Sequence, residues 1–197
     1  YLAVINNAAL LSYALGRFDE SLLLFDRALT FAQRTQRHRD EAQSLYGIGV
    51  TYYALGDRER ARQFLERSLA IRTAALDRRG RVNTLRALAT IDADEGRVAE
   101  AVAFDREALN LAVEPTYIQR IHIQLAVHTA ASGHLDDARA QLDQVIMGAA
   151  GPDPLVQAEA LLQRGVLLRQ MGQLRAALDD LSSSRPRLRG LGRVSEE

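Results

Sequence analysis

The sequence contains no cysteine, no tryptophan and no lysine. Without cysteine the chain forms no disulfide and offers no thiolate to a metal or a substrate. Only 4 prolines and 6% aromatic residues are present in 197 residues, whereas alanine and leucine are abundant. This composition favours helices that pack closely through small side chains. It predicts an all-α fold.

Charge gives no hint of a polyanionic partner. Basic and acidic residues number 25 each, so no net charge attracts nucleic acid or an anionic membrane surface. No apolar run approaches the ~20 residues of a membrane span. All basic residues being arginine is typical of a GC-rich bacterial genome, and the lack of cysteine fits a reducing cytoplasm. We expect a cytoplasmic bacterial protein without nucleic-acid or membrane partners, and a piece of a longer one, because Tyr1 already lies in an apolar-periodic segment.

A five-fold repeat dominates the sequence. In each copy a helical pattern leads to a glycine, and an amphipathic segment follows, with glycines at Gly16, Gly56, Gly96, Gly133 and Gly172, spaced by 40, 40, 37 and 39 residues. Glycine adopts the left-handed conformation after a last helical turn without steric cost, so each one predicts a helix end. Each repeat is therefore a helical hairpin.

The hairpins define one predicted repeat domain, residues 1–184. We place the repeats at 1–37, 38–78, 79–114, 115–151 and 152–184, and the helices at 2–15, 18–36, 39–55, 58–77, 80–95, 98–113, 116–132, 135–148, 154–171 and 174–184. Pro186 is expected to end the last helix. Residues 185–197 are then a poorly ordered tail or the start of a truncated sixth repeat.

Small residues recur at fixed places in both helices of the hairpin. The second helices have Ser21, Ala61, Ala101, Ala138 and Ala177, and the first helices have Ala9, Gly49, Ala89, Ala126 and Gly165. Small side chains let the two backbones approach closely. Larger residues are expected to fill the remaining gap: Phe25, Leu65, Phe104, Leu142 and Leu181.

Together with Leu88-Ala89 and Tyr52, these features resemble the tetratricopeptide repeat (TPR) over about Ala3 to Leu181. The spacing is nearer 40 than 34 residues and the closing proline is missing. This resembles the longer-period repeats of kinesin light chains, peptide-sensing bacterial regulators and bacterial proteins with a CHAT protease domain. The resemblance implies a right-handed superhelical solenoid whose first helices line a concave, partner-binding surface.

Helix periodicity then names candidate residues on the concave face. They form a mixed surface, apolar with scattered amide and arginine groups, which suits an extended peptide or a helix. Tyr13, Tyr46 and Tyr53 either form an aromatic anchor for a partner or pack on neighbouring helices. The candidates are Asn6, Leu10, Tyr13, Gln43, Tyr46, Val50, Tyr53, Asn83, Arg86, Arg120 and Ile123, with Val127, Leu162 and Val166 at matching places further on.

A terminal-carboxylate clamp, as some family members have, is incomplete here. Asn6, Arg86 and Arg120 are candidates for it, but repeat two offers only Gln43 and Tyr46.

Nothing in the sequence indicates catalysis, a metal or a cofactor. His122 and His128 are six residues apart, about 600° around a helix, so they do not chelate a metal together. His122 occupies a place that is apolar in the other copies, which predicts a packed, hydrogen-bonded role. Acid pairs such as Asp19-Glu20 lie in first helical turns, where carboxylates cap amides.

The leading interpretation is a protein- or peptide-binding scaffold or sensor module of a larger bacterial regulatory or signalling protein. Two alternatives stay open: a regulatory domain that binds a small signalling ligand in the groove, and self-association through exposed end repeats.

Overall fold

The computed structural model describes residues 2–148 and 153–192, with 185–192 as backbone. These residues form ten α-helices and no strand, which confirms the all-α prediction. The chain divides into two compact units, Tyr1–Arg97 (unit 1) and Val98–Glu197 (unit 2), and each is described by itself. In the described residues no helix is both long enough and apolar enough to cross a membrane.

Helices alternate between two roles, called here first and second helices. The first helices are α1 (Leu2–Ala14), α3 (His38–Ala54) and α5 (Arg78–Asp94) in unit 1, and α7 (Pro115–Ala131) and α9 (Pro154–Gln170) in unit 2. The second helices are α2 (Phe18–Arg34) and α4 (Arg58–Ala74) in unit 1, and α6 (Val98–Leu111), α8 (Leu135–Ile146) and α10 (Leu174–Gly192) in unit 2.

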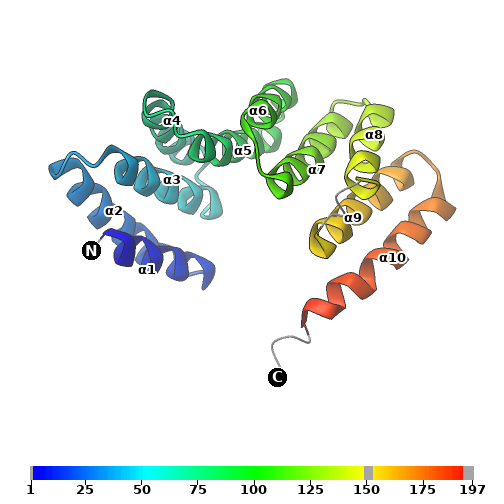
Figure 1. Cartoon of the computed structure of the whole chain (residues 1–197), viewed down its shortest axis with the longest axis horizontal. Coiled ribbons are helices and arrows are strands. Elements are labelled where there is room, and N and C mark those ends of the chain that lie inside the picture. Colours follow the sequence, from blue (N-terminus) through cyan, green and yellow to red (C-terminus); the bar gives the residue numbers. More distant parts are fainter. Residues whose placement is uncertain (1, 149–152, 193–197) are drawn as a thin grey trace. The chain divides into compact units, whose positions relative to one another are not determined.

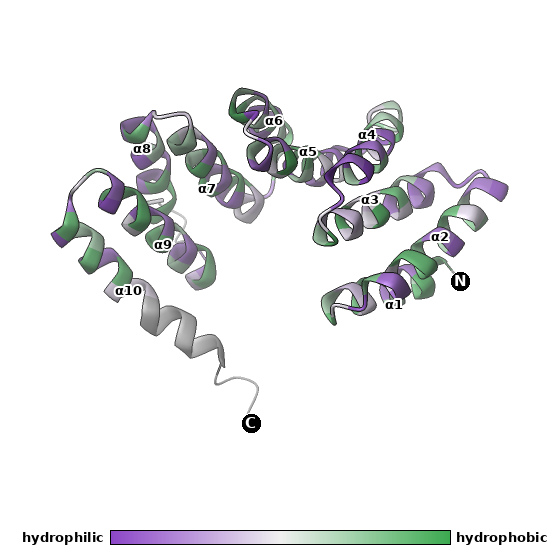
Figure 2. Ribbon diagram, turned by 180° about the vertical axis from the view of Figure 1, so that it is seen from behind, coloured by the Kyte–Doolittle hydropathy of each residue, from purple (hydrophilic) through white to green (hydrophobic). Residues whose placement is uncertain are grey.

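Within each unit, consecutive helices pack as antiparallel neighbours (Figure 1). First helices also contact one another: α1 against α3 and α3 against α5 in unit 1, and α7 against α9 in unit 2. Most helices carry both hydrophobic and hydrophilic residues (Figure 2), as expected of elements buried on one side. The first helices thus form a layer in each unit. The side of this layer that faces away from the second helices is called the first-helix face.

Five glycines close the turns from first to second helix. Gly16, Gly56, Gly96, Gly133 and Gly172 all have φ between 72° and 88°, which confirms the predicted helix ends. No sequence signal indicated a left-handed residue in the turns from a second helix to the next first helix. Two of them nevertheless use the left-handed region without glycine, at Gln36 (φ 55°) and Leu76 (φ 54°).

Glycines inside the first helices allow close packing. A Cβ added to Gly47 would collide with the ring of Phe25, and one added to Gly49 would lie 2.7 Å from Cγ of Leu65. In unit 2 the same relation joins Gly165 to Leu181, at 2.9 Å. These contacts confirm that small residues in one helix receive large residues from its neighbour.

One predicted core residue was assigned one position too early. Phe104 was expected to fill the gap in α6, but the structure buries Asp105 completely and leaves Phe104 half-buried. Asp105 lies four residues after Ala101, as Phe25 lies after Ser21 and Leu65 after Ala61. Its Oδ2 lies 2.6 Å from Nδ1 of the buried His128 on α7. A polar pair therefore occupies a place that is apolar in the other repeats.

The prediction that Pro186 ends the last helix is wrong. Helix α10 continues through Pro186 to Gly192. Proline has no backbone N–H, so the helix lacks one backbone hydrogen bond at Pro186. Of the predicted tail 185–197, residues 193–197 lie outside the described residues.

Candidate functional site

The structure places most of the predicted binding residues on the first-helix faces. Leu10 is 41% exposed on α1, and Arg120 is exposed on α7. The remaining ones on unit 1 are half-buried, so they offer part of their side chains to a partner: Tyr13, Gln43, Tyr46, Val50, Tyr53, Asn83 and Arg86.

Two predicted surface residues are buried instead. Asn6 is 7% exposed, and its Oδ1 accepts a hydrogen bond from Ser44 Oγ at 3.4 Å. Ile123 is 3% exposed and packs in the core of unit 2 with Ala126 and Leu142. Neither side chain offers surface to a partner in this structure, because the adjacent helices cover positions that lie at the edge of the helical stripe.

Each of the three predicted anchor tyrosines has its own neighbour within unit 1. The Tyr13 ring lies 5.7 Å from that of Phe18. The guanidinium of Arg72 lies 5.0 Å from the centre of the Tyr46 ring. The Tyr53 hydroxyl donates to Asp94 Oδ2 at 2.7 Å, and burial together with this carboxylate raises the pKa of Tyr53 to about 12. The rings are thus held in place by contacts within the unit.

Arg72 is a buried cation that the sequence did not single out. It extends from α4 between α3 and α5 and is 3% exposed. Its guanidinium donates to the carbonyl oxygen of Gly80, to Thr84 Oγ1 at 3.1 Å and to Gln43 Oε1 at 3.0 Å. Burial lowers the pKa of Arg72, although Asp77 opposes the shift. All its hydrogen-bond acceptors are neutral.

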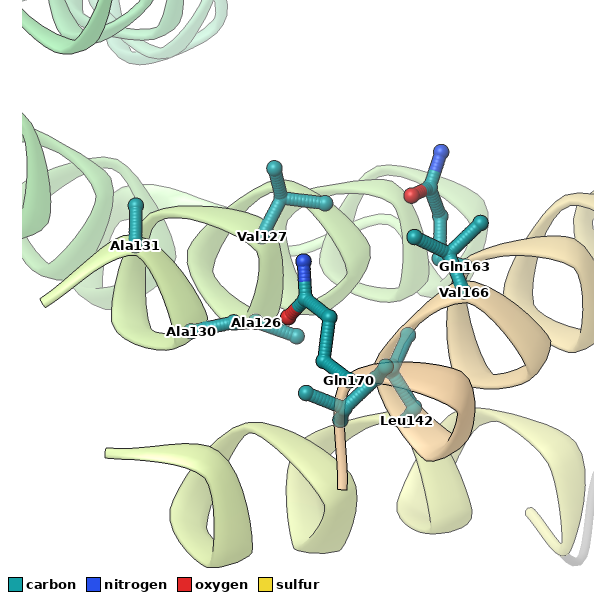
Figure 3. A pocket seen from close by; sticks show the side chains of 9 residues that line it. Ala126, Val127, Ala130, Ala131, Leu142, Gln163, Val166 and Gln170 are labelled. Atoms are coloured by element: carbon teal, nitrogen blue, oxygen red, sulfur yellow. The ribbon is translucent and has the colours of Figure 1, made fainter. Parts of the chain in front are cut away.

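Unit 2 has a pocket on its first-helix face, between α7 and α9. Its volume is about 210 Å³. Apolar side chains form most of the wall, and Gln163 and Gln170 contribute amides. Figure 3 shows that both amides and Val127 rise from the two ribbons on the same side. The wall consists of Ala126, Val127, Ala130, Ala131, Leu142, Gln163, Val166, Leu167 and Gln170.

The pocket has the chemistry of a side-chain socket. None of its lining residues is charged, so an apolar group enters without desolvating a charge. Val127 and Val166 are 40% and 37% exposed, which leaves apolar area for a ligand to cover. The glutamine amides each supply donors and an acceptor for a peptide backbone. Nowhere in the described residues do three or more histidine, aspartate or glutamate side chains form a group that could hold a metal.

Sequence reasoning found only part of this pocket. Val127 and Val166 were expected on the binding face, whereas Gln163 and Gln170 were missed. These glutamines are seven residues apart and bracket Val166, so they lie along one stripe of α9. That spacing was the available signal.

Comparisons with known proteins agree with this architecture. A sequence model described as Tetratricopeptide repeat matches residues 1–74. Tetratricopeptide repeat protein 29 of Trypanosoma brucei brucei is 26% identical over 125 residues, which cover 64% of this chain and 23% of that protein. The chain thus spans about a quarter of the length of this curated relative.

Solved structures extend the likeness of fold to nearly the whole chain. Nearly identical TPR-like repeats from Podosopora anserina match with a TM-score of 0.79 and 20% identity, over 98% of this chain and 96% of that one. The Rap conjugation gene regulator of plasmid pLS20, in complex with the Phr* peptide, matches with a TM-score of 0.74 and 17% identity, over 94% of this chain and 52% of that one. At such identities the likeness concerns the fold alone.

Repeats of this kind are protein-interaction scaffolds, and both the sequence match and the stacked hairpins point to them. Residues 1–74 thus match the tetratricopeptide repeat by sequence, and the described part of the chain shares the fold of such repeats.

Proposed function

We propose that this chain binds an extended peptide segment of another protein on its first-helix faces, as the scaffold or sensor module of a larger regulatory protein. The observation that carries the proposal is the apolar pocket between α7 and α9 with its two glutamine amides. An extended peptide presents apolar side chains and unpaired backbone groups together, and this pocket offers partners to both.

Two further observations support a peptide over a small signalling ligand. The valines on both helices of the pocket stay more than a third exposed, whereas small-molecule sites bury most of their ligand. A structural neighbour of the same fold was solved in complex with a peptide. The wider context, a cytoplasmic bacterial signalling protein, rests on the sequence features alone.

The test begins with a peptide selected for binding. Phage-displayed random 12-residue peptides are selected on the whole chain, and the affinity of the best binders is measured by fluorescence anisotropy. The double variant Val127→Asp/Val166→Asp places two charges at the pocket, and we expect it to weaken binding at least tenfold because a desolvated carboxylate replaces an apolar contact. Leu178→Asp on α10 is the matched control, since Leu178 is 67% exposed and lies outside the pocket.

The proposal fails if every selected peptide binds the double variant as tightly as the wild type. Circular dichroism of both variants verifies that helicity is unchanged. Because both valines are already more than a third exposed, we expect their replacement to leave the fold intact.

A further inference from the structure

Unit 2 has a second cavity, which shares no lining residue with the pocket between α7 and α9. It lies among α6, the end of α7 and the start of α8, and its volume is about 350 Å³. Its lining residue Thr129 follows Val127 by two positions, about 200° around α7, so the two cavities lie on different sides of this helix. The volume is within the range of about 300–1,000 Å³ that is usual for small-molecule sites.

Two opposite charges line this cavity. Arg106 extends from α6 and Asp137 from the first turn of α8, and both side chains are exposed. Neither side chain forms a hydrogen bond or an ion pair with any residue that the structure describes. The cavity therefore offers a guanidinium to an anionic group and a carboxylate to a cationic one.

The corresponding places of other repeats hold charges that are paired within the chain. Counted from the turn glycine, Arg106 corresponds to Asp143, which accepts from Arg164 at 2.6 Å. Thr129 corresponds to Asp92, whose carboxylate accepts from two arginines. The charges at those places stabilise the fold, whereas the charges of this cavity are available to a ligand.

Thr129 adds a buried hydroxyl to the wall. The residue is 7% exposed, and its Oγ1 has no hydrogen-bond partner among the described residues. A buried hydroxyl without a partner destabilises a fold, so its presence calls for a reason. Because Thr129 lines the cavity, a polar group of a bound ligand can supply the missing partner.

His134 adds a hydrogen-bond acceptor. Ser132 Oγ donates its single proton to the carbonyl oxygen of Thr129 at 2.7 Å, so it accepts from His134 Nδ1, which lies 3.0 Å away. The neutral imidazole therefore carries its proton on Nδ1 and has a lone pair on Nε2. Both His134 and Asp137 line the cavity, so this nitrogen and the carboxylate can accept from the same ammonium group.

A ligand with a single charge would leave the other charge of the wall unpaired, whereas an α-amino acid carries both charges on one carbon atom. We infer that this cavity binds a free α-amino acid with an aliphatic side chain. Its carboxylate pairs with Arg106, and its ammonium group donates to Asp137 and His134 Nε2. Apolar surface for the side chain comes from Ala99 and Val102. The inference goes beyond peptide binding, because it assigns a second, small ligand to the chain.

The experiment titrates L-valine into the whole ¹⁵N-labelled chain and follows the backbone amides by NMR. Two analogues keep the branched carbon chain and lose one charge each: isovalerate lacks the ammonium group, and isobutylamine lacks the carboxylate. We expect L-valine to cause saturable shifts at Val102, Thr129 and Asp137. Its affinity should be at least tenfold above that of either analogue, because each analogue leaves one charge of the cavity unpaired.

Charge-removing variants locate the binding site. Arg106→Gln and Asp137→Asn should each weaken L-valine binding at least tenfold, and the fold tolerates both changes because the side chains are exposed. Asp136→Asn is the matched control, since Asp136 belongs to the same helical turn, has an 81% exposed side chain and does not line the cavity. Arg175→Gln removes an exposed arginine of α10. Both controls should bind L-valine as tightly as the wild type does.

Thr129→Val separates ligand binding from folding. Valine keeps the branched shape of threonine and removes a hydroxyl that has no partner among the described residues. The free energy of unfolding should therefore not fall, whereas the affinity for L-valine should fall at least threefold. A merely structural role of Thr129 would not change the affinity.

The absence of saturable shifts with L-valine overturns the inference, and so does an analogue that binds as tightly as L-valine. A wild-type affinity in any of the three cavity variants, at Arg106, Thr129 or Asp137, overturns it as well. These outcomes leave the proposed function untouched, because that proposal is tested with selected peptides and with Val127 and Val166 on the other side of α7.

Discussion

His128 on α7 and Asp105 on α6 form a buried pair, with Nδ1 and Oδ2 2.6 Å apart. The carboxylate has no exposed area and the imidazole is 8% exposed. Leucine or phenylalanine occupies the matching place in the other second helices, at Phe25, Leu65 and Leu142. The pair thus stabilises the α6–α7 contact by a polar interaction, at a place where the other repeats use an apolar side chain.

Breaking this pair from one side is expected to destabilise the chain. His128→Leu deprives the buried carboxylate of its imidazole, which should lower the free energy of unfolding by roughly 3–5 kcal/mol. The double variant Asp105→Leu/His128→Leu restores an apolar contact and should recover most of that loss. Urea unfolding followed by circular dichroism measures both. A double variant no more stable than His128→Leu contradicts this account.

Leu76 offers a site for stabilisation. Its φ of 54° is unfavourable for a residue with a Cβ, by roughly 1–2 kcal/mol, and its side chain is 80% exposed, so little packing is lost on its removal. We expect Leu76→Gly to raise the free energy of unfolding by about 0.5–1 kcal/mol after the greater freedom of glycine in the unfolded chain is subtracted.

Gly56 is the matched control for Leu76. It has a φ of 82°, and a Cβ added there would meet no atom within 4 Å. Gly56→Ala therefore tests backbone conformation without steric contact, and we expect a loss of about 1 kcal/mol. Thermal unfolding of the two variants should move in opposite directions; a shift of the same sign would refute the conformational explanation.

The contact between Gly47 and Phe25 predicts a specific rescue. A methyl group at position 47 would collide with three atoms of the Phe25 ring, so Gly47→Ala should cost about 1–3 kcal/mol through overpacking. Phe25→Leu shortens the opposing side chain. The double variant should then be less destabilised than the sum of the two single variants, which a double-mutant cycle measures directly. Strict additivity would show that the two residues do not share this space.

Alkaline pH should lower the folding stability of unit 1 through ionisation of Tyr53. Its pKa in the folded chain is about 12, above the ordinary value of 10.0, so folding favours the protonated phenol. The associated stability is fully present below pH 10 and is lost as the pH rises toward 12. Asp94→Asn removes the carboxylate acceptor and should lower the Tyr53 pKa, as read from the ring carbon shifts by NMR. An unchanged pKa in Asp94→Asn would assign the shift to burial alone.

The hairpins were predictable because their signals are local. Glycine at a helix end and small residues on one helical stripe act within a few residues, and Gly16 through Gly172 all turned out as expected. The assignment of Phe104 failed for a different reason. The spacing from Gly96 favours Asp105 over Phe104, but the partner that makes a carboxylate tolerable there, His128, lies on another helix. A side-chain pair between two helices cannot be recognised from the local sequence of either helix.

The candidate sites were only partly predictable for the same reason. Arg72 lies at a place where α2 has Ala32, so nothing on α4 distinguishes it from a solvated arginine. Its burial follows from Gly80 on α5, where a Cβ would lie 2.8 Å from Cδ of Arg72. Likewise, Gln163 and Gln170 line a pocket only because α7 lies beside α9.

The leucine-over-glycine contact occurs once in each unit, as Leu65 over Gly49 and as Leu181 over Gly165, with closest separations of 2.7 and 2.9 Å for an added Cβ. The joint inside the α3–α4 hairpin is therefore the same as that inside the α9–α10 hairpin. Such a hairpin is a module whose two helices pack through the same leucine–glycine contact. Duplication can copy the whole hairpin, and selection can then alter the outer residues of each copy. In this chain one such hairpin carries the buried Arg72 on α4, and α9 of the other lines the uncharged pocket.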